Sequence, residues 1–184
     1  MKKSIQLLVA ICILTVFGCK QNSEASVETT AEENATPAVG QSAVVDETSS
    51  PNIVQTASGS KDHTTLVTAV KAAGLVDVLS NAGPFTVFAP TNAAFDKLPK
   101  GTVEGLLEPS KKDDRKNILE YHTYVGNLKT EYMQDGQEYE QVNGGKIKIT
   151  KVGDKVFVNG SEIVASITTA NGMIHVINDV LLPK

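Results

Sequence analysis

Apolar residues recur at helical spacing in two parts of the region from residue 53 to residue 184. Between Thr64 and Ala73 the aliphatic side chains lie three or four positions apart, which places them on one face of a helix. Gly74 suits the left-handed conformation that commonly follows a helix. Lys111–Val125 has the same spacing and is followed by Gly126, so the pattern predicts a longer second helix there.

A short strand and a capped helix are predicted between these two helices. Thr86–Ala89 is rich in β-branched and aromatic residues, and Pro90 ends it because proline has no backbone N–H to donate. Thr91 can cap a following helix over Asn92–Leu98 by accepting a hydrogen bond from an N–H group in its first turn.

The second half of the region changes to the period of two that is typical of strands. Lys146–Thr150 alternates polar residues with isoleucine, which predicts one buried and one solvent-exposed face. Asn143-Gly144 is a strong turn signal and joins this strand to Glu138–Val142 as a hairpin. The further strands predicted are Lys155–Val158, Glu162–Thr168 and Met173–Leu182. Helices followed by antiparallel hairpins predict an α+β domain, with the helices packed at one end or face of the sheet.

The first 18 residues have the pattern of an export signal. Lys2 and Lys3 precede an apolar run, Ile5–Phe17, that is too short for a stable membrane span. Val16-Phe17-Gly18-Cys19 resembles a bacterial lipobox, which implies cleavage before Cys19 and acylation of that residue. Two or more acyl chains anchor a protein stably to a bilayer. Two interpretations stay open, a lipidated Cys19 or a plain cleaved signal with an incidental cysteine.

The segment that follows has the composition of a spacer. Lys20–Asn52 contains no Leu, Ile, Phe, Tyr or Trp and carries one lysine and six carboxylates. Such a segment cannot bury enough apolar surface to offset the entropy of ordering, so we expect a disordered acidic tether with a reach of roughly 30 Å. The chain is thereby divided into a signal peptide (1–18), a lipidated Cys19 with its tether (19–52) and one domain (53–184).

Charge and composition narrow the chemistry of this domain. The net charge of the chain is −4, and the region 53–184 holds 14 basic and 15 acidic residues, so it lacks the basic excess of a nucleic-acid binder. With Cys12 in the discarded signal and Cys19 acylated, no thiol is left for catalysis or metal binding. The chain contains no Trp, which removes the indole ring as a platform for sugar stacking.

Three segments resemble the signature motifs of fasciclin (FAS1) domains. They are Gly83–Phe95 (GPFTVFAPTNAAF), Ile118–His122 (ILEYH) and Asn171–Pro183 (NGMIHVINDVLLP). In this order and at this separation they cover nearly all of the region 53–184. The resemblance implies the FAS1 fold, a wedge-shaped antiparallel β-sandwich of about seven strands with packed α-helices.

Most residues of these motifs are expected to stabilise the fold. They are Thr86, Phe88, Pro90, Thr91, Asn92, Phe95, Asn171, Gly172, His175 and Asp179. Deleting a large apolar side chain among them would cost about 2–5 kcal/mol if that side chain is buried. In some animal members of the family the Tyr-His segment is linked to receptor binding. Tyr121 and His122 therefore have two interpretations, packing in the core or contact with a partner.

The sequence contains no pattern that indicates catalysis, metal binding or cofactor binding. His63, His122 and His175 lie in separate elements without the spacing of metal ligands. We expect His122 and His175 to be buried and hydrogen-bonded, and His63 to be solvated. A Gly-x-Ser-x-Gly elbow, a P-loop and a dinucleotide fingerprint are all missing from the sequence. We therefore expect a protein that is not an enzyme and uses neither a metal nor a cofactor.

Together these features predict a lipid-anchored protein of the cell envelope. Its first predicted function is a non-catalytic adhesion or interaction module, whose partner is a cell-surface or matrix protein or a polysaccharide. The alternative is a lipoprotein that binds a small ligand in a cleft between helices and sheet, and a hydrolase is the third hypothesis. We expect a monomeric domain. Lys20 after Cys19 favours the outer membrane, on its periplasmic face or at the cell surface.

Overall fold

A seven-stranded sheet organises the part of the chain that the computed structural model describes, residues 50–99 and 101–183. The strands lie in the order β2-β1-β7-β6-β5-β4-β3. Their bounds are β1 Phe85–Pro90, β2 Thr123–Val125, β3 Glu138–Glu140, β4 Lys146–Val152, β5 Lys155–Val158, β6 Ser161–Thr169 and β7 Gly172–Ile177. Together with the helices that precede them, these strands confirm the predicted α+β class.

β1 and β7 are parallel neighbours, and they bring the two longest motifs side by side. Their register runs from Phe85 opposite Gly172 to Pro90 opposite Ile177. The other neighbouring strands are antiparallel, so the sheet is mixed at this pair rather than antiparallel throughout. Parallel neighbours require a long connection, and here everything from α4 to β6 lies between β1 and β7 in the sequence.

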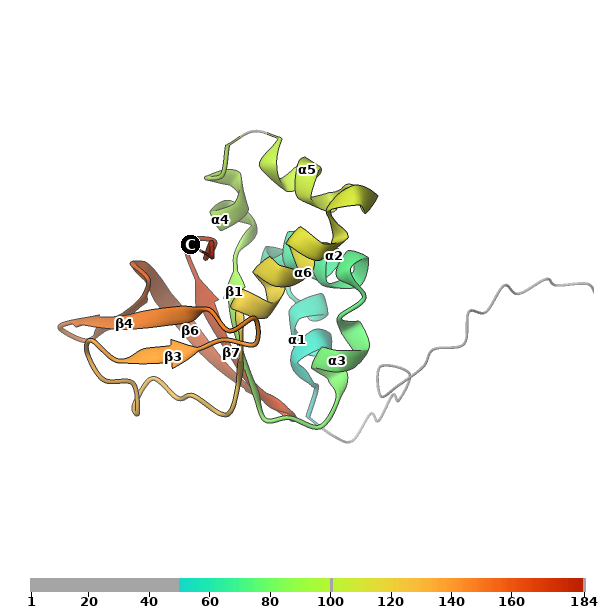
Figure 1. Cartoon of the computed structure of the whole chain (residues 1–184). Coiled ribbons are helices and arrows are strands. Elements are labelled where there is room, and N and C mark those ends of the chain that lie inside the picture. Colours follow the sequence, from blue (N-terminus) through green and yellow to red (C-terminus); the bar gives the residue numbers. More distant parts are fainter. Residues whose placement is uncertain (1–49, 100, 184) are drawn as a thin grey trace, which may run out of the picture. The chain divides into compact units, whose positions relative to one another are not determined.

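The helices lie on one side of β1 and β7 and at one end of them, whereas β3 and β4 lie on the other side (Figure 1). Their bounds are α1 Ile53–Gly59, α2 Thr64–Ala73, α3 Val76–Ser80, α4 Asn92–Asp96, α5 Thr102–Leu107 and α6 Lys112–Tyr121, with 3-10 turns at Lys61–His63 and Pro109–Lys111. The pattern of apolar residues did not predict α1 or α5.

Two hydrophobic cores occupy the two faces of β1 and β7, because alternate residues of a strand point to opposite faces. The helix-side core takes Val87, Ala89, Ile174 and Val176, packed against apolar residues of α1, α2, α3 and α6. The opposite core takes Phe88 and Ile177, packed against β4 and β5. Both faces of these strands are therefore dry, which explains why β7 is buried along its whole length.

Several element ends follow the predicted local signals. α2 spans the predicted Thr64–Ala73 and ends at Gly74, which has a left-handed φ of 72°. Thr91 Oγ1 accepts a hydrogen bond from Ala94 N at 3.3 Å and caps α4 as predicted.

The helix predicted over Lys111–Val125 ends early. α6 stops at Tyr121, and Thr123–Val125 instead pairs with β1 as β2. Two of the three residues in β2 are β-branched and suit a strand. Helical spacing continued past Tyr121 in the sequence, but pairing with β1 determines the structure of these residues.

The last predicted strand, Met173–Leu182, also ends early, at Ile177. Asn178 and Asp179 leave the sheet and are held by Ser161, whose hydroxyl donates to Asn178 Oδ1 at 3.2 Å and accepts from Asp179 N at 3.0 Å. The C-terminal segment is thereby directed across the end of β5 and β6 instead of extending β7.

Candidate functional site

The three motif segments meet at His122, the residue that follows α6. Phe88 N donates a hydrogen bond to the His122 carbonyl at 2.8 Å. Leu181 N donates to His122 Nε2 at 3.0 Å. His122 thus connects the segment 118–122 both to β1 and to the chain beyond β7, so the three motifs form one structural unit.

His122 is 2% exposed and is held as a neutral imidazole. Its Nδ1 lies 2.8 Å from the Ile118 carbonyl, which can only accept, so Nδ1 carries the proton and Nε2 accepts from Leu181. Burial lowers the pKa of His122 to about 4, although the hydrogen bond to Ile118 acts in the opposite direction. At neutral pH this side chain is an uncharged connector within the core.

His175 lies at the centre of β7 and is also fully buried. Its ring stacks on Phe88 with centroids 5.6 Å apart. Nε2 donates to the Leu128 carbonyl at 2.6 Å, so Nδ1 accepts from Ser166 Oγ at 2.7 Å. Burial lowers the pKa of His175, against the effect of the hydrogen bond to Leu128. A hydroxyl beside an imidazole resembles a nucleophile and its base, but the third group here is a carbonyl, and the two bonds satisfy a buried ring.

Thr86 and Asn92 connect elements through short hydrogen bonds. Thr86 Oγ1 donates to the Gly126 carbonyl at 2.7 Å and accepts from Leu128 N at 2.9 Å, which joins β1 to the loop after β2. Asn92 Oδ1 accepts from Thr65 N at 3.1 Å, and its Nδ2 donates to the Lys61 carbonyl at 2.9 Å. Asn92 therefore fixes α4 against the start of α2.

Asn171, in the turn between β6 and β7, connects three further elements. Its Oδ1 accepts from Ile53 N at 2.9 Å, and its Nδ2 donates to the carbonyls of Leu79 and Asn81 at 2.8 Å each. Its own carbonyl accepts from Phe85 N at 3.1 Å. One turn residue thus joins α1, the end of α3 and β1.

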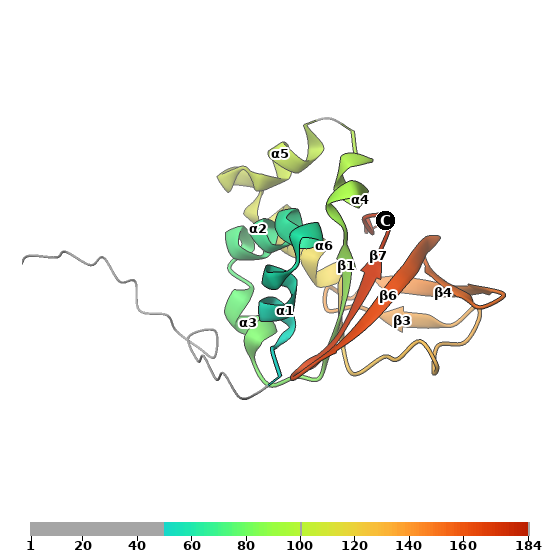
Figure 2. The same ribbon diagram turned by 180° about the vertical axis from the view of Figure 1, so that it is seen from behind.

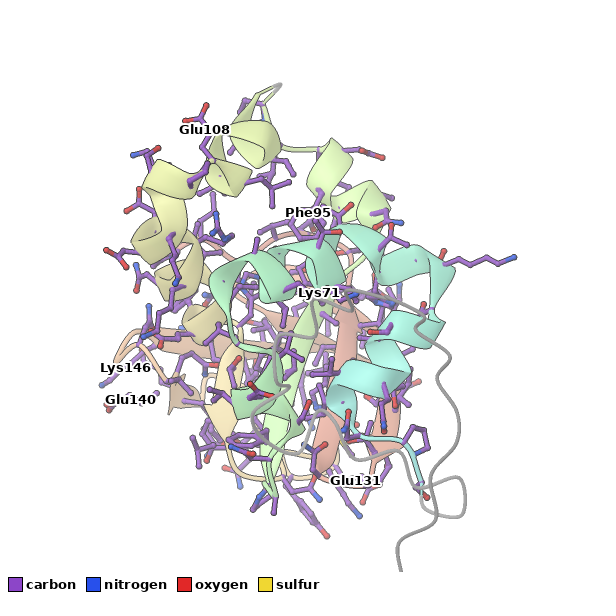
Figure 3. All side chains as sticks on the ribbon, turned by 90° about the vertical axis from the view of Figure 1, so that its right-hand side faces the viewer. Lys71, Phe95, Glu108, Glu131, Glu140 and Lys146 are labelled. Atoms are coloured by element: carbon purple, nitrogen blue, oxygen red, sulfur yellow. The ribbon has the colours of Figure 1, made fainter. Side chains whose placement is uncertain are left out.

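The other motif residues are divided between the core and the surface. Pro90 is buried at the end of β1, and Phe95 packs against the helix-side core between α4 and α2 (Figure 3). Asp179 is on the surface, where it forms an ion pair with Lys97 at 2.7 Å. Surface ion pairs of this kind contribute at most about 1 kcal/mol.

Tyr121 is 3% exposed, so neither side chain of the Tyr121-His122 pair is available at the surface of the folded domain. The Tyr121 hydroxyl donates to the Lys146 carbonyl at 2.8 Å and accepts from Asn159 Nδ2 at 2.9 Å. This burial favours the interpretation of the pair as core packing. The Tyr121 hydroxyl nevertheless lies directly beneath a hollow in the surface.

Two hollows that share lining residues open on this side of the domain, with volumes of about 540 and 580 Å³. Both are lined by Lys148 and Asn159, which places them next to each other. Around them lies a set of amide and ammonium side chains from α6, the β3–β4 turn, β4 and the β5–β6 turn. We call this set the amide groove, and its members are Asn117, Asn143, Lys146, Lys148 and Asn159.

The amides of this groove are held by backbone N–H groups and by other side chains. Asn143 Oδ1 accepts from Gly145 N at 3.0 Å, and its Nδ2 donates to Asn117 Oδ1 at 2.8 Å. Asn159 Oδ1 accepts from Lys148 N at 2.9 Å. Lys146 lies at the periphery (Figure 3), and its ammonium group forms an ion pair with Glu138 at 3.8 Å. Fixed amides beside the Lys148 ammonium group and the Lys146–Glu138 ion pair suit a ligand rich in hydroxyl or carbonyl groups.

The cavities between the helices and the sheet are much smaller. One, of about 40 Å³, lies between α2, α4, α5 and α6, and the other, of about 20 Å³, lies between α1, α2 and the strands β1 and β7. Ligand sites typically measure about 300–1,000 Å³. These two cavities are therefore smaller than a typical ligand site, and the small-ligand hypothesis gains no support from them.

The prediction of a solvated His63 is wrong, since this side chain is only 5% exposed. Its Nδ1 lies 2.8 Å from Ser60 Oγ. Burial lowers its pKa, and the neighbouring Asp62 acts in the opposite direction. Within residues 50–99 and 101–183, no group of three or more His, Cys, Asp or Glu residues could hold a metal ion. In the same residues no helix is long and apolar enough to cross a membrane. Cys19 and the tether up to residue 49 lie outside the described part of the chain.

The amide groove was not found by sequence reasoning. Its residues are polar, are spread from 117 to 159, and lie mainly in turns or on exposed strand positions. The one available signal was the pair of Asn-Gly sequences at 143–144 and 159–160, a pattern that indicates only a turn.

The chain belongs to the fasciclin family, because the model of the fasciclin domain matches residues 61–183. The match includes all three motifs quoted above. A solved FAS1 domain pair, from the insect cell adhesion molecule fasciclin I, has a TM-score of 0.61 and 17% sequence identity over 72% of this chain and 51% of that chain. This similarity shows the FAS1 fold that the motifs predicted.

Two bacterial proteins are similar in sequence. Protein sll1483 of Synechocystis is 42% identical over 182 residues, which covers 98% of each chain. The cell surface glycolipoprotein MPT83 of Mycobacterium tuberculosis is 38% identical over 110 residues, which covers 59% of this chain and 48% of MPT83. The chain thus aligns with nearly the whole length of the first protein but with only about half of the second.

Proposed function

We propose that this chain is a lipid-anchored interaction module of the bacterial cell envelope, which binds a protein or a polysaccharide through the amide groove without covalent chemistry. The observation that carries the proposal is the size and chemistry of this groove in a domain of the fasciclin family. The names of two similar proteins, a cell adhesion molecule and a cell surface glycolipoprotein, support a role at the cell surface.

The groove supplies recognition without a reactive group. Asn117, Asn143 and Asn159 offer amide donors and acceptors. Lys148 and Lys146 add positive charge, and the carboxylates of Glu138 and Asp179, paired with Lys146 and Lys97, lie in the same lining. Peptide groups and sugar hydroxyls, which both donate and accept hydrogen bonds, are the groups that such a surface recognises.

Replacing Lys148 by glutamate is expected to weaken partner binding by about tenfold or more, because Lys148 lines both hollows and the change reverses the charge between them. The measurement is retention of the protein on whole cells, immobilised glycans and extracellular matrix proteins. The matched control is Lys112→Glu, an equal charge change on the exposed surface of α6. Equal retention of the two variants, or no retention of the parent chain, would count against the groove.

The anchor is tested separately at Cys19. We expect Cys19→Ser to abolish acyl labelling and to move the protein from the membrane to the soluble fraction, because no other residue in the motif can be acylated through a thiol. The assay is metabolic labelling with a fatty acid, followed by membrane fractionation. If the serine variant stays in the membrane fraction, the lipoprotein assignment is incorrect, whatever the result at Lys148.

A further inference from the structure

One edge of β6 has no partner strand among the described residues. β5 pairs with β6 only at Ser161 and Glu162. β7 pairs with the other edge from Ile163 to Thr169, with a register shift between Ile163 and Ala165, so the pairing is regular from Ala165 onward. Residues 164–168 are exposed, and Figure 2 shows β6 at the front of the sheet with no helix in front of it. The edge formed by residues 164–168, about two repeats of the two-residue strand period, is therefore open to the addition of another strand.

A hydrogen bond to the segment that precedes α1 shows which backbone groups of β6 point to the open edge. Ala170 N, just beyond β6, donates to the Pro51 carbonyl at 3.1 Å. Alternate residues along a strand direct their N–H and C=O groups to the same side. The backbone N–H and C=O groups of Thr168 and Ser166 therefore point to the open edge, on the same side as the Ala170 N–H that bonds Pro51.

This edge also lacks the charges that usually prevent strands from pairing. Ile163–Gly172 contains no Asp, Glu, Lys or Arg, and the side chains of Val164 and Ile167 are 53% and 38% exposed. By contrast β3, at the end of the strand order, carries Glu138 and Glu140. Natural edge strands are commonly protected by charged side chains, so the two edges differ in the property that controls association.

We propose that the β6 edges of two copies of this chain pair antiparallel about a two-fold axis at Ser166. A second copy supplies an uncharged strand edge of its own. No like charges meet when two such edges pair, and the interface is self-complementary. In this register Ala165 lies opposite Ile167 of the partner subunit, and the two sheets become continuous. The pairing replaces the monomeric domain expected from the sequence. It does not rest on the proposed anchor, although anchoring would raise the local concentration of copies.

Cysteine cross-linking of the full chain tests both the pairing and its register. Ser166→Cys places two cysteines directly opposite, with Cα atoms about 5.5 Å apart, within the range of about 4.4–6.8 Å for disulfides. Because the thiol replaces the hydroxyl that bonds His175 Nδ1, thermal unfolding first checks that this variant folds. We expect a disulfide-linked dimer under mild oxidation. Thr168→Cys is the control. In this register the two cysteines at position 168 are four residues apart along the paired strands, so their Cα atoms are roughly 14 Å apart and should not cross-link. The parent chain, with Cys12 and Cys19, gives the background.

A charge-pair experiment separates strand pairing from a general loss of apolar surface. Ala165→Lys with Ile167→Lys puts lysine opposite lysine, whereas Ala165→Lys with Ile167→Glu puts lysine opposite glutamate, and both remove the same apolar groups. In the Ser166→Cys background we expect about tenfold less dimer for the first pair than for the second. Thermal unfolding checks that both variants fold.

Three results would overturn the proposal. They are equal cross-linking at positions 166 and 168, equal behaviour of the two charge pairs, and a full chain that gives no dimer at position 166. The last result is expected if the segment before Pro51, or another protein, covers the edge.

Discussion

Replacing Gly172 by alanine is expected to destabilise the domain by about 3 kcal/mol or more. Gly172 pairs with Phe85 where β7 begins, at a φ of 154°. An added Cβ would overlap the Phe85 carbonyl oxygen and lie 2.8 Å from the Phe85 nitrogen. These are backbone atoms of the neighbouring strand, so relief requires β1 and β7 to separate, and both cores depend on that pair. Chemical denaturation at neutral pH, with and without the substitution, measures the loss.

Gly160→Ala is the matched control for this prediction. Gly160 also has a positive φ, of 89°, but an added Cβ there would meet nothing within 4 Å. Gly160→Ala should lower the free energy of unfolding by only about 1 kcal/mol, the ordinary penalty for a side chain in the left-handed region. If the two alanine variants lose the same stability, the close approach of β1 to Gly172 is not what requires glycine.

Local signals in the sequence predicted the elements whose ends are determined locally. Gly74 ends α2 and Thr91 caps α4 through contacts within a few residues, and the Asn143-Gly144 turn gives the β3–β4 hairpin. The same reasoning failed at Thr123–Val125 because the partner of that strand, β1, lies far away in the sequence. Elements are predictable where the stabilising contact is local.

The resemblance to fasciclin domains identified the fold but not the surface that is free to bind. His122 and His175 were expected to be buried and hydrogen-bonded, and each does bond through both ring nitrogens. The amide groove and the open β6 edge have no periodic pattern. They arise from which strands pair and where that pairing stops, as at Glu162, and only the three-dimensional structure shows this.

Lowering the pH from 7 to 5 is expected to reduce the free energy of unfolding by about 2 kcal/mol through His122 alone. Its pKa is lowered to about 4 in the folded domain and returns to 6.5 on unfolding. Because the folded-state pKa is the lower one, the contribution is complete above pH 6.5 and is lost as the pH falls toward 4. Burial also lowers the pKa values of His175 and His63, which adds to the effect in the same direction.

Urea denaturation at a series of pH values measures this dependence, and His122→Gln identifies its source. Glutamine can donate to the Ile118 carbonyl and accept from Leu181 N, as the imidazole does, but it does not titrate. The variant should therefore retain only the smaller pH dependence that arises from His175 and His63. An unfolding free energy in the parent chain that stays constant from pH 7 to pH 5 would show that folding does not lower the pKa of His122, so that His122 is protonated in the folded domain at pH 5. In that case its Nε2 could not accept from Leu181, and the junction of the three motifs would have to be held in another way.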